Sequence, residues 1–105
     1  MNLAKFDLIV TNPPFTYAEQ FIEKAHGKLT PNGIGLFLCK YSIAACLRRR
    51  EMWKRVNLRE IWMLVPRPSF YGGSSDACEY CYFIFDAGPV TDEVSFYWLM
   101  WKETK

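Results

Sequence analysis

Two consecutive prolines directly after an apolar run impose the strongest constraint on how this chain folds. Residues 8–10 (Leu-Ile-Val) are continuously apolar, which is typical of a strand buried on both faces in a parallel sheet. Pro13 keeps Asn12 out of the helical region, and Pro14 does the same to Pro13. Because neither proline has an N–H to donate, the sequence predicts a rigid, extended platform at the end of a strand.

This platform carries two hydrogen-bond acceptors and an aromatic ring. Ligands bind at the carboxyl ends of strands in open α/β sheets. The Asn12 side-chain oxygen and the Pro13 carbonyl are able to accept both hydrogens of an exocyclic amino group, which frees the nitrogen lone pair for attack. Phe15 is placed to stack on the planar ring that bears the amine. Residues 12–15 are therefore the candidate catalytic site.

The segment Asn12-Pro13-Pro14-Phe15 after an apolar strand resembles the catalytic motif of S-adenosylmethionine (SAM)-dependent amino-methyltransferases, chiefly the N6-adenine DNA enzymes. The resemblance implies that an adenine is flipped out of the DNA duplex and that its amino nitrogen attacks the SAM methyl group directly. The resemblance implies that Asn12 and the Pro13 carbonyl hold the amino group, that Pro14 keeps the platform rigid, and that Phe15 stacks on the base. The same motif occurs in RNA and protein-glutamine methyltransferases, so these substrates remain alternatives.

Strands and helices are predicted to alternate along the rest of the chain, as in a doubly wound α/β sheet. Thr16 and Glu19 have capping-box spacing and predict the start of a helix, which the turn residues 30–33 end. The helix is expected to bury an apolar stripe of Ala18, Phe21, Ile22, Ala25 and Leu29. Further elements are expected as strands at 34–39, 58–65, 78–86 and 94–101 and a second helix from Ser42 to about Val56.

The resemblance also implies a sheet order, in which the strand at 78–86 runs antiparallel between its two predecessors. We therefore expect residues 1–105 to form a single partial domain, the C-terminal half of a Rossmann-like class I methyltransferase. This α/β domain has a mixed, mostly parallel sheet with flanking helices. The glycine-rich turn that receives SAM in such folds is not found, because only eleven residues precede Asn12.

Three interpretations of this partial domain stay open. The chain is a fragment of a longer enzyme, a subunit whose companion chain carries the cofactor-binding half, or an inactive module that binds DNA or another subunit. In each case the first strand is expected to have an unpaired edge, and such edges recruit partners. A homodimer or a companion chain at this edge is therefore expected.

Basic residues and one long loop are the candidates for substrate binding. Six basic residues fall within twelve positions, and Arg48 and Arg49 among them are candidates for phosphate contacts with DNA. A solvated helix face explains such a cluster equally well. A second candidate region is the proline- and glycine-rich loop at 66–77. In this loop Arg67 is a candidate for contact with phosphate, and Phe70 or Tyr71 is a candidate for stacking on a base. The alternative is a connector with one packing aromatic residue.

Composition limits the remaining possibilities. The chain has 105 residues, half of them hydrophobic, which predicts one globular domain, and its net charge of +2 does not by itself require a polyanionic partner. No apolar run approaches the length of a membrane span and no secretory signal is visible, so a cytoplasmic location is expected.

Cys78 and Cys81 have C-x-x-C spacing but fall on a predicted strand, where their side chains point to opposite faces. Free thiols are therefore expected for all four cysteines, and no metal site is predicted.

Overall fold

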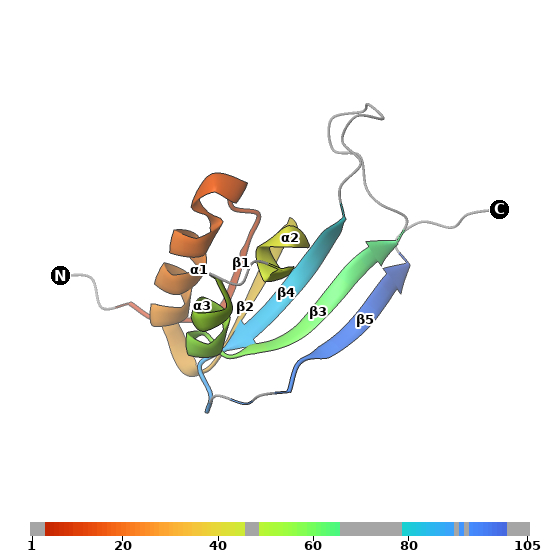
Figure 1. Ribbon diagram of the computed structural model, residues 1–105. Coiled ribbons are helices and arrows are strands. Elements are labelled where there is room, and N and C mark those ends of the chain that lie inside the picture. Colours follow the sequence, from red (N-terminus) through yellow and green to blue (C-terminus); the bar gives the residue numbers. More distant parts are fainter. Residues whose placement is uncertain (1–3, 46–48, 66–78, 90, 92, 101–105) are drawn as a thin grey trace.

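Five strands form one mixed sheet in the order β1-β2-β4-β3-β5 (Figure 1). The structure, a computed structural model, describes residues 4–45, 49–65, 79–89, 91 and 93–100. The strands are β1 (Phe6–Thr11), β2 (Leu29–Lys40), β3 (Leu58–Val65), β4 (Tyr80–Asp86) and β5 (Ser95–Met100).

One strand runs against the direction of the other four. β1 pairs with β2 in parallel and β3 pairs with β5 in parallel, whereas β4 is antiparallel to both β2 and β3. The predicted antiparallel strand between its two predecessors is thus confirmed. β3 has the predicted bounds, and β5 adds a parallel strand at the second edge of the sheet.

The described helices pack on one face of this sheet (Figure 1). They are the 3₁₀-helix η1 (Phe15–Tyr17), α1 (Ala18–Gly27), α2 (Ser42–Ala45) and α3 (Arg50–Arg55). Phe37, Phe83 and Ile61 are register partners across β2, β4 and β3, so their side chains lie on one face. All three belong to the hydrophobic core that also contains Ile22 of α1 and Trp53 of α3. This face of the sheet is therefore the buried one.

The first helix differs from its prediction at both ends. The backbone N–H of Tyr17 donates to the Pro14 carbonyl at 3.0 Å, so a 3₁₀ turn forms before the α-helix and Thr16 lies inside that turn. The α1 N-cap is Tyr17 with no side-chain cap, so the capping box was wrong. Leu29 belongs to β2, and Phe21 is 47% exposed because it borders an open groove beside β1.

The turn expected at residues 30–33 lies inside β2 as an irregularity. Phe6 pairs with Leu29 and Leu8 with Ile34, so five residues of β2 span the same distance as two residues of β1. The pairing with β1 resumes after this bulge, which is why β2 begins five residues before the predicted strand. The second predicted helix is described as α2 and α3, and residues 46–48 between them lie outside the described residues.

β1 is not the buried strand that its apolar run predicted. Phe6, Leu8 and Val10 are 48%, 60% and 59% exposed. The reason is the position of β1 at an edge of the described sheet, where β2 is its one neighbour among the described strands. As far as the described residues go, this strand has the unpaired edge that was expected.

The two described cysteines are buried free thiols, as predicted. Cys39 and Cys81 are register partners on β2 and β4, and burial raises the pKa of each to about 12. Glu79 and Cys39 add to the increase at Cys81. Cys46 and Cys78 lie outside the described residues.

In the described part of the chain, no group of three or more His, Cys, Asp or Glu side chains is arranged to hold a metal ion. None of the described helices has the length and apolar character that crossing a membrane requires.

Candidate active site

The Asn12–Phe15 platform lies at the carboxyl end of β1, as the sequence predicted. Pro14 is extended, with φ of −57° and ψ of 135°, and η1 begins at the next residue. Pro13 is buried, which anchors the platform, while Asn12 is exposed. Among the described residues, neither the Asn12 side chain nor the Pro13 carbonyl takes part in a hydrogen bond. Within the described part of the chain, the exposed Asn12 side chain is therefore open to a ligand, whereas the Pro13 carbonyl belongs to a buried residue.

Phe15 is 37% exposed and has two cations beside its ring. Lys40 Nζ lies 5.5 Å and Arg49 Cζ 5.2 Å from the ring centroid. Cations at these distances are attracted to the ring face. A base that stacks on Phe15 would thus meet positive charge at the same position, which suits a ligand that also carries a phosphate.

Arg49 lies partly beneath the surface, and its side chain is only 14% exposed. Its Nε is 3.9 Å from Glu19 Oε2, which is an ion-pair distance but too long for a hydrogen bond. Nε is also buried with no hydrogen-bond partner in the described part of the chain. A buried guanidinium nitrogen without a partner is unfavourable, and the nearby Glu19 carboxylate offsets part of its charge.

The basic cluster around Arg49 does not form one free cationic surface. Arg55 pairs with Glu23 of α1, and Arg59 pairs with Asp86 at 3.2 Å. The structure brings Asn12, Phe15 and Arg49 to the same edge of the sheet. The other predicted substrate-binding residues lie outside the described residues; they are Arg48, Arg67, Phe70 and Tyr71.

Sequence reasoning missed Lys40 and Glu19 as parts of this site. Lys40 is the last residue of β2, which runs parallel to β1, so the carboxyl ends of both strands meet at one edge. A lysine at the end of an apolar strand was therefore the available signal. Glu19 was interpreted only as a capping residue, and its contact with Arg49 depends on how α1 packs near α3.

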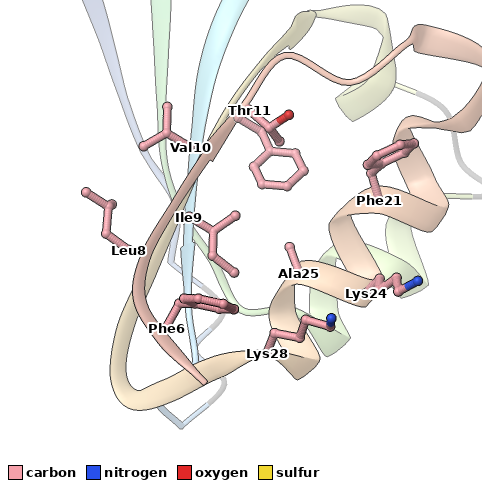
Figure 2. Close-up of a pocket in the computed structure, with 10 residues that line it drawn as sticks. Phe6, Leu8, Ile9, Val10, Thr11, Phe21, Lys24, Ala25 and Lys28 are labelled. Carbon is pink, nitrogen blue, oxygen red and sulfur yellow. The ribbon is translucent and has the colours of Figure 1, made fainter. Parts of the chain in front are cut away.

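A groove lies between β1 and α1, below Thr11 (Figure 2). Its volume is about 470 Å³, and its floor includes Ile9, Ala25 and Phe37. The charged groups that line it are Lys24 and Lys28. SAM carries a sulfonium and an ammonium group besides its one carboxylate, and two lysines over an apolar floor supply no anionic partner for those cationic groups. The described lining of this groove therefore does not fit the methyl donor.

Comparison with known proteins identifies the fold. No family model and no curated protein matches the chain, but solved methyltransferases share its structure. A putative class I SAM-dependent methyltransferase from Listeria monocytogenes superposes with a TM-score of 0.64 at 15% identity, over 94% of this chain and 38% of the other. A predicted O-methyltransferase from Agrobacterium tumefaciens gives 0.54 at 19% identity, over 91% and 45%.

M1.HpyAVI, in its complex with SAM, gives a TM-score of 0.52 at 14% identity, over 84% of this chain and 46% of the other. The chain thus spans less than half the length of these methyltransferases. At such identities the likeness shows the fold alone. The fold is a part of the Rossmann-like domain of class I SAM-dependent methyltransferases, in agreement with the predicted fold class.

Proposed function

We propose that this chain supplies the amine-binding part of a SAM-dependent amino-methyltransferase whose acceptor is the N6 amino group of adenine in DNA. The observation that carries the proposal is a pair of acceptors, Asn12 Oδ1 and the Pro13 carbonyl, that form no hydrogen bond with any described residue and lie close in sequence to the exposed Phe15. The methyltransferase fold of the neighbours supports it.

The chemistry of the platform follows from its two acceptors. Asn12 Oδ1 and the Pro13 carbonyl accept the two N–H groups of the adenine amine, which localises the lone pair on the nitrogen. When bound, SAM supplies the methyl group. In such a transfer the donor would leave as a neutral thioether, and the proton released from the amine would pass to water at the exposed Asn12, so no strong base would be needed. Pro14 keeps the acceptors in place because its φ is fixed.

Single-stranded oligonucleotides that differ at one base test this assignment. We expect the 105-residue chain to bind a thymine oligomer with one central adenine about tenfold more tightly than the same oligomer with N6,N6-dimethyladenine, which has no N–H to donate. Fluorescence anisotropy of labelled oligomers measures the affinities, and NMR shifts of the Asn12 side-chain amide locate the bound base.

Two variants complete the experiment. Asn12→Ala should abolish the discrimination between the two oligomers, whereas Asn32→Ala, which changes an exposed amide in β2, should preserve it. Equal affinity of the unaltered chain for both oligomers would contradict the assignment of Asn12 and Pro13.

The second candidate function is an inactive module that binds DNA without reading the amine. The finding that favours it is the lack of a SAM site among the described residues, because the charged groups that line the groove beside β1 are both cations, Lys24 and Lys28. Such a module would bind both oligomers equally and also a thymine-only oligomer. Preference for an RNA oligomer or for a glutamine peptide would instead favour the other amino-methyltransferase substrates.

A further inference from the structure

The edge of β1 has the properties of an unfilled strand position. β1 pairs with β2 on one side, and among the described strands none pairs with its other side. The N–H and C=O groups on that side are therefore open to another strand. Leu8 and Val10 are 60% and 59% exposed, although a strand with such residues is normally covered.

Apolar side chains are exposed on both faces of this edge. Figure 2 shows Leu8 and Val10 pointing away from α1, while Ile9 and Phe6 point toward the groove between β1 and α1. Phe21 borders the same groove from α1 and is 47% exposed. An added strand would cover the outer face of β1 and extend apolar side chains into the groove.

Two lysines beside the groove indicate which kind of partner segment would bind there. Lys24 of α1 and Lys28, the C-cap residue that follows α1, both line the groove (Figure 2). Within the described part of the chain, no carboxylate forms an ion pair with either lysine. Glu23, their acidic neighbour on α1, is already paired with Arg55. Two unpaired cations beside apolar side chains are complementary to an apolar segment flanked by acidic residues.

We infer that the β1 edge and this groove are a docking surface for a second polypeptide. The partner adds a strand alongside β1, inserts apolar side chains beside Phe6, Ile9 and Phe21, and places acidic residues opposite Lys24 and Lys28. The inference does not depend on what Asn12 binds.

A second copy of this chain is a less suitable occupant. Its edge carries Lys5 together with Lys24 and Lys28, and Asp7 on the same strand already accepts a hydrogen bond from Thr30 at 2.7 Å. The net charge of +2 adds repulsion between copies. Asp7 is the one carboxylate of β1, so a second copy would bring more lysines than carboxylates to this edge.

Strand peptides of defined charge test this inference directly. We compare two peptides of about ten residues that share a Val- and Leu-rich centre, one flanked by glutamates and the other by lysines. Fluorescence anisotropy should show about tenfold tighter binding of the glutamate peptide at low salt, with the preference decreasing as salt is added. Hydrogen exchange should show protection of the β1 amides when that peptide is bound.

Charge reversal supplies the matched variants. The double variant Lys24→Glu and Lys28→Glu should invert the preference, whereas Lys54→Glu on α3 should leave it unchanged. Thermal unfolding should confirm that all variants fold. Asn12→Ala should not alter peptide binding, which separates this inference from the proposed adenine site.

Two results would overturn the inference. One is equal binding of the two peptides, or protection that falls on β5 and spares β1. The other is a stable homodimer in analytical ultracentrifugation that Val10→Lys converts to a monomer, because a second copy would then occupy the edge.

Discussion

Cys39 and Cys81 show how individual side chains adapt to the sheet. They face each other across β2 and β4, and both are buried in the core. Burial disfavours the thiolate, which raises the pKa of each thiol from 9.0 to about 12. Since the thiolate is the reactive form, neither residue is a nucleophile near neutral pH.

We expect two consequences of these raised pKa values. Cys39 and Cys81 should resist iodoacetamide at pH 8 in the folded chain and react once it is unfolded, as followed by mass spectrometry of their peptides. Below pH 9 both states keep the thiols protonated, but between about pH 9 and 12 only the unfolded chain loses these protons. The contribution of the thiols to stability is therefore lost as the pH rises through this window. Rapid alkylation of either folded thiol at pH 8 would contradict their burial.

The close packing of strand β2 against strand β4 depends on one glycine, Gly35. A Cβ at Gly35 would overlap the aromatic ring of Phe85, which is fully buried on the neighbouring strand β4. Phe85 in turn packs edge-on against Phe37, with ring centroids 5.1 Å apart. The absence of a side chain at Gly35 is thus what allows β2 and β4 to bury this ring.

Substitution of Gly35 should measure this packing. Gly35→Ala is expected to lower the free energy of unfolding by about 1–3 kcal/mol, because the ring and the strand must shift. Gly27→Ala is the matched control, since an added Cβ there meets nothing within 4 Å. It should be neutral or stabilising by about 0.4–1 kcal/mol through the unfolded state. Urea unfolding followed by tryptophan fluorescence measures both changes, and equal stability of the two variants would exclude the proposed overlap.

At the scale of the whole molecule, one side of the sheet is complete and the other is open. The helices cover the face that bears Phe37 and Phe83, while Val10, Leu36 and Ile84, which are register partners, lie on the opposite face. No described helix covers that opposite face (Figure 1). The molecule therefore presents the Asn12–Phe15 platform at one edge, but its described residues do not surround a methyl donor.

This incompleteness predicts how the chain alone responds to SAM. Isothermal titration calorimetry of the 105-residue chain should detect no binding at micromolar concentrations, because the groove next to β1 offers two lysines to a cationic ligand. Lys24→Glu with Lys28→Glu serves as the control for this electrostatic argument. Micromolar binding by the unaltered chain would show that the methyl-donor site is formed after all.

Local chemistry was enough to predict the platform and most strands. The fixed φ of Pro13 and Pro14 and the apolar run before them act within a few residues, so Asn12–Phe15 was placed correctly at the end of β1 from the sequence. The strand at 58–65 was predicted with the observed bounds for the same reason. The antiparallel position of β4 came from the family resemblance, since periodicity contains no information on strand order.

Tertiary structure decided the features that depend on contacts between distant residues. The buried Asn57, with φ of 54°, donates its side-chain amide to Asp86 and accepts from the Thr91 N–H at 3.0 Å, and no local pattern indicates either partner. Exposure of β1, the position of Lys40 beside Phe15 and the pairing of Arg59 with Asp86 likewise follow from strand order and helix packing. The sequence by itself determined the extended Asn12–Phe15 platform through backbone restriction. Only the assembled sheet determined its cationic surroundings and the open edge beside it, because burial and charge pairing are properties of neighbours in space.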